Sequence, residues 1–154
     1  MLDQPSPHDH RAADEAAIRS LVEQRADATR RHDIDATIAL YTADVVGFEL
    51  PPPLAQGPAQ MRDAAQIREW FSTWDGPILW DTRDLRVVVG GDVAYAHALD
   101  NMRGTKKTGE KVDLWLRSTI GLRREHGAWK IAHTHSSVPF YMDGSLRAAV
   151  DLSP

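Results

Sequence analysis

The sequence predicts an α+β domain in which a curved antiparallel sheet packs on three N-terminal helices. The first half carries apolar residues at helical spacing, and the second half carries long strand-like segments joined by short glycine turns. The 154 residues are 42% hydrophobic and 26% charged, which is typical of one globular domain. We expect a disordered tail over 1–11, the domain over 12–140 and a C-terminal extension over 141–154.

Three segments have the periodicity of helices. The first covers 14–31 and has a mostly apolar stripe that Arg25 interrupts. Asp33 is placed to cap a short second helix. A Gly-Pro pair at 57–58 begins the third helix and another at 76–77 ends it. The apolar stripe of the third helix consists of Ile67, Trp70, Phe71 and Trp74.

The remaining elements are strands. A first strand over 45–50 ends at the proline run 51–53, because proline cannot continue a ladder of hydrogen bonds. Short turns join the later strands, so these should form an antiparallel meander. The four later strands are expected over 78–89, 93–103, 111–124 and 128–138.

Composition excludes several classes of function. A net charge of −4 argues against a nucleic-acid binder, which usually has a basic face. The absence of cysteine excludes disulfides, thiol nucleophiles and thiolate metal sites. No apolar run reaches the length of a membrane span, and the N-terminus has no pattern of a secretory signal, so we expect a cytoplasmic protein. Nucleotide-binding glycine motifs are also absent, and we expect no cofactor.

Several short motifs together resemble the nuclear-transport-factor-2-like superfamily, the cone-shaped, cystatin-like fold of ketosteroid isomerase and SnoaL-type polyketide cyclases. These motifs are His-Asp-Ile-Asp-Ala at 32–36, Leu-Tyr-Thr-Ala-Asp at 40–44, Gly-Asp-Val-Ala at 91–94, Arg-Ser-Thr at 117–119 and Gly-Ala-Trp-Lys-Ile at 127–131. Four further motifs resemble the SnoaL-like subgroup of uncharacterised proteins, and they lie at 51–54, 74–78, 112–115 and 133–140. The resemblance covers about residues 12–140. It implies the fold more strongly than a function, because this fold carries enzymes, binding proteins and assembly modules.

The resemblance places the general-base aspartate of ketosteroid isomerase at Glu49, which keeps a carboxylate. It places the oxyanion-hole tyrosine at Arg25. Arginine would change the charge of such a hole, so we do not expect steroid isomerisation by that machinery.

Two histidines on the last predicted strand are candidate catalytic residues. His133 and His135 alternate along the strand and should share one face with Ile131, which we expect to lie under the helices. Imidazole titrates near neutral pH, so either ring could act as general acid or base, with Glu49 as a third candidate. The alternative is a pair of hydrogen-bonded wall histidines. Together with His97 they could in principle bind zinc, but no metal motif supports this and we expect no metal.

The strand over 111–124 alternates polar and apolar residues, and its sequence does not fix which face lines a cavity. If Arg117 faces inward, it could anchor an anion; if outward, it would pair with Asp113 or a partner subunit. The aromatic residues could form the wall of an apolar pocket or simply fill the core. The candidate ligand-binding residues are Tyr41, Trp74, His97, Trp115, Arg117 and Thr119.

We therefore expect an apolar pocket for a small cyclic or polyketide-like molecule, with cofactor-independent proton transfer of the isomerase or cyclase type. The alternative function is a non-catalytic ligand-binding or dimerisation domain. A cavity with a histidine and a carboxylate would favour the enzyme, and a cavity plugged by tryptophans would favour the module. The resemblance also implies a homodimer through the sheet face, with Ala132, Thr134 and Ser136 as candidate outward residues. We expect neither nucleic acid nor membrane as partners.

Overall fold

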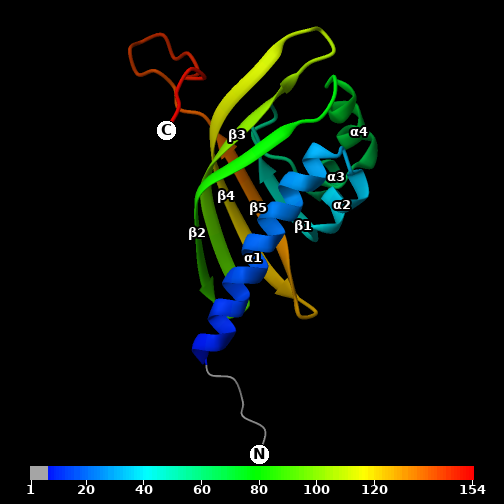
Figure 1. The fold of residues 1–154 in the computed structure, drawn as a ribbon, viewed down its shortest axis with the longest axis vertical. Coiled ribbons are helices and arrows are strands. Elements are labelled where there is room, and N and C mark those ends of the chain that lie inside the picture. Colours follow the sequence, from blue (N-terminus) through cyan, green and yellow to red (C-terminus); the bar gives the residue numbers. More distant parts are fainter. Residues whose placement is uncertain (1–6) are drawn as a thin grey trace, which may run out of the picture.

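The computed structural model describes residues 7–154, with side chains from residue 10, and shows a curved five-stranded sheet wrapped around one long helix (Figure 1). The helices are α1 (Pro7–Arg30), α2 (Ile34–Ala39), α3 (Pro58–Met61) and α4 (Ala64–Ser72). The strands are β1 (Tyr41–Phe48), β2 (Leu79–Gly90), β3 (Val93–Thr105), β4 (Lys111–Glu125) and β5 (Ala128–Ser137). Residues 1–6 of the expected tail lie outside the described residues, whereas residues 7–11 belong to α1.

The sheet confirms the predicted meander and adds one parallel pair. Strands β2, β3, β4 and β5 pair antiparallel in sequence order, and β1 lies at the edge, parallel to β5. Helix α1 crosses the concave face of the sheet (Figure 1). Its apolar stripe packs there against the inward side chains of the strands. The main core cluster includes Ile18, Leu21, Val22, Ile120, Leu122 and Ile131.

The helix caps act as the sequence indicates, with one difference. The Asp33 carboxylate accepts the backbone N–H of Ala36 at 2.9 Å and begins α2. The predicted third helix is two helices, because the carboxylate of Asp63 accepts the N–H of Ala65 at 2.9 Å and begins α4 separately.

A bulge in β5 decides which residues face the helices. Ile131 pairs with Leu122 and His133 pairs with Gly121, so Ala132 is an extra residue on β5. One extra residue moves every later side chain to the opposite face of the sheet. Ile131 is fully buried under α1, and the alternation reverses just after it.

The reversal overturns two expectations from the sequence. His133 and His135 do not share a face with Ile131; they lie on the convex, outer face. Thr134 and Ser136, expected to point outward, are 1% and 7% exposed and face the interior. The strict alternation assumed from the sequence fails because it takes no account of the bulge.

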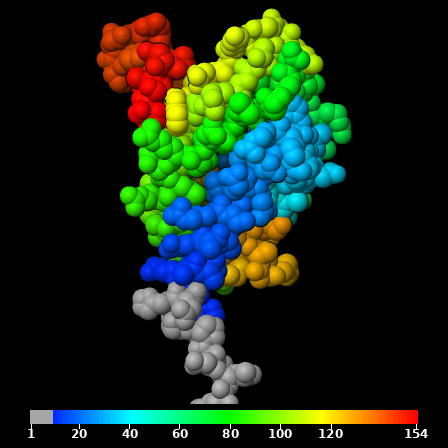
Figure 2. Space-filling view, viewed as in Figure 1, coloured from blue at the N-terminus to red at the C-terminus, as the bar shows by residue number. Residues whose placement is uncertain are grey.

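The C-terminal extension forms a separate turn-rich lobe beside the sheet, coloured orange to red in Figure 2. A bridge joins Phe140 to Ala148, and the Tyr141 hydroxyl donates to the Asp151 carboxylate at 2.7 Å. Within residues 7–154, no helix is both long and apolar enough to cross a membrane.

Candidate functional site

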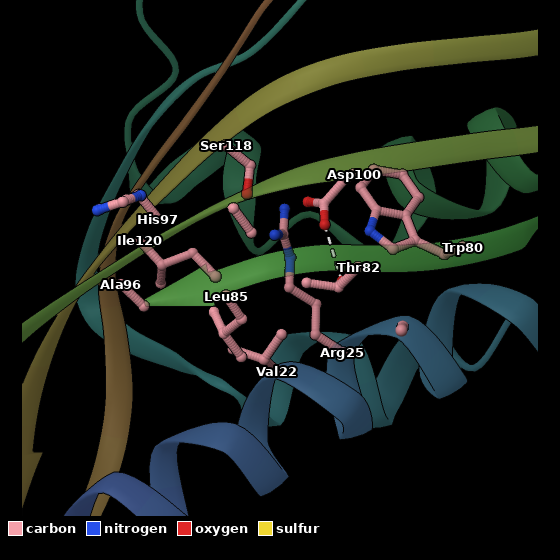
Figure 3. Close-up of a pocket in the computed structure, with 12 residues that line it drawn as sticks. Val22, Arg25, Trp80, Thr82, Leu85, Ala96, His97, Asp100, Ser118 and Ile120 are labelled. Atoms are coloured by element: carbon pink, nitrogen blue, oxygen red, sulfur yellow. Dashed lines mark hydrogen bonds between the residues drawn. The ribbon is translucent and has the colours of Figure 1, made fainter. Parts of the chain in front are cut away.

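The interior of the sheet contains a cation supplied by α1. Arg25 lies on the same stripe as Val22 and Ala26, so its side chain extends from α1 toward the sheet (Figure 3). Its guanidinium carbon lies 5.8 Å from the centre of the Trp80 ring, a cation–π contact. Arg25 therefore places a positive charge among largely apolar inward side chains.

A carboxylate on β3 faces this cation. Asp100 is 2% exposed and follows Ala96 and Ala98 on the inward face of the strand. The Thr82 hydroxyl on β2 donates to Asp100 Oδ1 at 2.8 Å (Figure 3). One oxygen of Asp100 is thus held by a hydroxyl, as expected for a buried carboxylate.

A second carboxylate comes from the end of β1. The Thr134 hydroxyl on β5 donates to Glu49 Oε1. Glycine at position 47 makes room beside it, because a Cβ there would lie 2.5 Å from Met61 Sδ. The backbone carbonyl of Tyr41, at the other end of β1, accepts from the Arg62 guanidinium at 3.0 Å. These contacts tie one end of β1 to β5 and the other end to the residue that follows α3.

The electrostatics show that these groups interact. Burial lowers the pKa of the Arg25 guanidinium, but Tyr41, Glu49 and Asp100 together raise it above the usual value. Burial raises the pKa of the Tyr41 phenol, Arg25 partly offsets this effect, and Glu49 adds to it. The guanidinium is therefore charged and the phenol neutral at physiological pH. We call Arg25, Tyr41, Glu49 and Asp100 the interior polar group.

Arg25 and Asp100 of the interior polar group line a cavity, and this cavity is small. Its volume is about 10 Å³, close to the least that holds one water molecule. Val22, Leu85 and Trp80 are among the side chains that fill the space around it. A cyclic ligand could enter only if these side chains moved.

The outer face carries most of the other predicted site residues. His97 is exposed and its ring turns away from Arg25, although the residue borders the cavity (Figure 3). His97 pairs with Thr119, and Thr119 pairs with His135, so all three share the outer face. Arg117, two residues before Thr119, also points outward, which resolves the alternative left open by the sequence. Trp115 lies on that same face.

The two candidate histidines pack against β1 on that outer face. His133 Nδ1 donates to the Val46 carbonyl at 2.8 Å. The Phe48 ring meets both imidazoles edge-on, with centroids 4.8 Å from His133 and 5.8 Å from His135. Their catalytic role stays a prediction, but the structure does not bring them to the interior polar group.

Trp74 lies elsewhere. It is 3% exposed and forms a second apolar cluster with Phe71 and Ile78, away from the cavity beside Arg25. Among the described residues, no group of three or more histidine, aspartate or glutamate side chains is arranged to hold a metal ion.

Of the predicted residues, the structure brings Glu49 and Tyr41 to the interior polar group. Sequence reasoning missed Asp100 and Thr82. It treated Arg25 as a break in an apolar stripe, and the resemblance placed the oxyanion-hole tyrosine at that position. A charged residue at an inward helical position is itself a signal of a polar site. Asp100 lies on the same face of β3 as Ala96 and Ala98. A charged residue at an inward position of a strand likewise indicates a polar site.

Comparison with known proteins gives a family. The model of the SnoaL-like domain matches residues 18–141. A search of curated proteins finds no match. An NTF2-like protein of unknown function from Pseudomonas putida is 32% identical, with a TM-score of 0.81 over 93% of this chain and 98% of that chain. A proposed aromatic ring hydroxylase from Novosphingobium aromaticivorans is 26% identical, with a TM-score of 0.66 over 91% of this chain and 96% of that chain.

More distant matches show the fold alone. The association domain of CaMKII from Caenorhabditis elegans is 19% identical, with a TM-score of 0.66 over 84% of this chain and 98% of that chain. The matched domain spans most of the sequence, and the observed helices and curved sheet are those that the resemblance implied. The chain belongs to the SnoaL-like family, within the nuclear-transport-factor-2-like superfamily.

Proposed function

We propose that the interior of the sheet binds a small cyclic or polyketide-like molecule through a carbonyl oxygen and transfers a proton without a cofactor. The observation that supports this most is the interior polar group itself. Charged side chains among apolar ones destabilise a fold unless they are compensated, and they are common at working sites. The group also contains two carboxylates and one guanidinium, so the charge of one carboxylate is not balanced by Arg25.

Glu49 is the proposed general base. Thr134 holds one of its oxygens and leaves the other able to accept a proton. In the proposed step, Glu49 takes a proton from the carbon next to the carbonyl, the C–H electron pair forms a carbon–carbon double bond, and the π electrons of the carbonyl move to its oxygen. Arg25 stabilises the negative charge that develops on that oxygen, and the neutral Tyr41 can donate a hydrogen bond to it. In a ketone with a double bond next to that carbon, return of the proton from Glu49 to the far end of the double bond re-forms the carbonyl and completes an isomerisation.

Binding requires the cavity to open. Trp80 lies against the Arg25 guanidinium and occupies the space that a ring would need. A planar ligand would displace the Trp80 ring from Arg25 and then stack against that ring. The contact between Trp80 and Arg25 would be replaced by a contact between Trp80 and the ligand.

The small cavity favours a second candidate, a non-catalytic assembly module. A filled interior needs no ligand, and one distant structural match is an association domain. This candidate leaves the interior polar group without a chemical role, so we rank it second.

Both candidates include a homodimer through the outer face of the sheet. That face exposes Phe48, Val88 and Tyr95 by 41%, 42% and 49%. A second copy would cover these side chains, as an antiparallel sheet with helices on one face needs. Light scattering should give twice the mass of the 17.2 kDa chain, and a monomeric mass at micromolar concentration would contradict the dimer.

Proton exchange can test the catalytic proposal without knowledge of the substrate. The probe is 2-tetralone in D2O, whose α-protons are replaced by deuterium at a rate that NMR measures. Wild-type protein should accelerate the exchange, and Glu49→Gln should reduce that acceleration by about 10²–10⁴-fold. His135→Gln, on the outer face, is the matched control and should retain it. If His135→Gln loses the acceleration and Glu49→Gln keeps it, the proposed site is wrong.

A further inference from the structure

A second hollow lies outside the sheet, where the end of α1 and the beginning of α2 meet α4 and the segment before β2. These elements lie together at one side of the molecule (Figure 1). The hollow has a volume of about 720 Å³ and is open to solvent, and this is within the range of pockets that hold small organic molecules. We call it the basic cleft. Its charged lining residues are all cationic: Arg30, Arg31, Arg68 and Lys107.

The inner wall of the basic cleft is aromatic. Phe71 and Trp74 line it and are 5% and 3% exposed. The His32 ring stacks on Phe71, with centroids 4.8 Å apart and planes within 9°. His32 has a φ of 56°, a left-handed conformation uncommon outside glycine, and this conformation places its ring in the cleft wall. An aromatic wall of this kind suits a flat, apolar ligand.

The positive charge of the cleft is only partly compensated. Arg30 and Arg31 share the carboxylate of Asp27, at 3.1 and 3.0 Å, and Arg31 also lies 3.8 Å from a carboxylate oxygen of Asp33. Lys107 lies 3.7 Å from Asp75. Arg68 is exposed and makes no ion pair within 4.0 Å in the part of the chain that the structure describes. An anion in the cleft would relieve the repulsion among these cations.

Two ring nitrogens in the wall have no partner. Trp74 Nε1 and His32 Nε2 are buried and form no hydrogen bond within the described structure. An unpaired buried polar group has a desolvation cost that a hydrogen bond would remove. Trp74 Nε1 is an N–H donor, so an acceptor oxygen is the kind of partner that it lacks.

From these observations we propose that the basic cleft binds a small organic anion with a flat apolar body, of the aryl carboxylate class. The carboxylate pairs with Arg68 and Arg31, because a guanidinium binds a carboxylate through two parallel hydrogen bonds. The ring lies against Phe71, Trp74 and Pro77. This site is separate from the interior polar group and does not depend on the function proposed for it.

The test uses 2-naphthoate as the anion and 2-naphthamide as its neutral counterpart. Binding is followed by the NMR signals of the five tryptophan indole N–H groups, and the variant Trp74→Phe identifies the signal of Trp74. Naphthoate should shift the Trp74 signal in a saturable way, while the Trp80 signal, which reports the interior, stays in place. Naphthamide should bind at least about tenfold more weakly, since it lacks the charge.

Arg68→Gln should weaken naphthoate binding by about tenfold. The matched control is Arg83→Gln, which removes one exposed arginine charge from β2 and should change the affinity by less than about twofold. Three results would overturn the proposal: equal affinity for the anion and the amide, equal losses in the two variants, or a naphthoate-induced shift of Trp80 without one of Trp74. The last result would locate anion binding in the interior and would support the proposed function instead.

Discussion

The two faces of one sheet differ in what their polar residues contact. On the concave face, Asp100 and Glu49 each accept a hydrogen bond from a threonine and lie near one guanidinium. On the convex face, His97 and His135 are exposed beside aromatic rings. Histidine is the residue type most often linked to proton transfer, yet here the carboxylates occupy the enclosed position. The position of a side chain, more than its type, determines whether it can act in an interior site.

The largest expected change in unfolding free energy comes from removing the cation on the inner face, compared with removing a cation on the outer face. Arg25→Met keeps most of the side-chain length but leaves Asp100 and Glu49 without their cation, so unfolding free energy should fall by about 3 kcal/mol. Arg117→Met, on the outer face, should change it by less than about 0.5 kcal/mol. Urea unfolding measures both, and similar losses would mean that Arg25 does not stabilise the carboxylates.

The second prediction tests the packing around Glu49. A Cβ at position 47 would lie 2.5 Å from Met61 Sδ and 3.1 Å from Glu49 Oε1. Gly47→Ala should therefore cost about 1–2 kcal/mol in unfolding free energy, since crowding a packed contact is destabilising. Gly90→Ala is the control, because the nearest atom to its Cβ is 4.0 Å away. An unchanged melting temperature for Gly47→Ala would show that α3 does not pack closely on β1.

The third prediction separates the two outer histidines. His133→Ala removes the hydrogen bond to the Val46 carbonyl and should cost about 1 kcal/mol of unfolding free energy. His135→Ala removes an exposed ring without such a bond, and its effect should stay within about 0.5 kcal/mol. Chemical denaturation compares the pair. A larger loss for His135→Ala would indicate that this ring is buried by a partner or turned inward.

The smallest expected effect on stability comes from Tyr41 and occurs only at alkaline pH. The pKa of the Tyr41 phenol is raised in the folded protein, mainly by burial, so the unfolded chain loses this proton first. The stabilisation from Tyr41 is fully present below the unfolded pKa of about 10 and is lost as pH rises toward the folded pKa. Melting temperature measured from pH 8 to pH 11 should fall less steeply for Tyr41→Phe than for the wild type. An unaltered slope in Tyr41→Phe would contradict the burial of the phenol.

Much of the fold could be predicted because its signals are local. Asp33 caps α2 as expected, and the four later strands follow their turns. The parallel pairing of β1 with β5 could not be predicted from local pattern, because it joins segments distant in sequence. The split of the third helix was missed because Asp63 was not recognised as a second cap.

The candidate site was predicted only in part for a similar reason. Glu49 and Tyr41 were expected in the pocket and contribute to the interior polar group. His133 and His135 were assigned to the wrong face because a single extra residue, Ala132, reverses the alternation of β5. A bulge of this kind has no glycine or proline to mark it in the sequence.

The proposed function requires that small molecules bind on the inner face, at the interior polar group. The most direct measurement is a crystal structure of the protein soaked with 2-tetralone. We expect Trp80 to move, the carbonyl oxygen to lie within hydrogen-bond distance of Arg25, and the α-carbon to lie next to the Glu49 carboxylate. A structure in which the interior stays filled and the ketone binds only beside His135 on the outer face would contradict it.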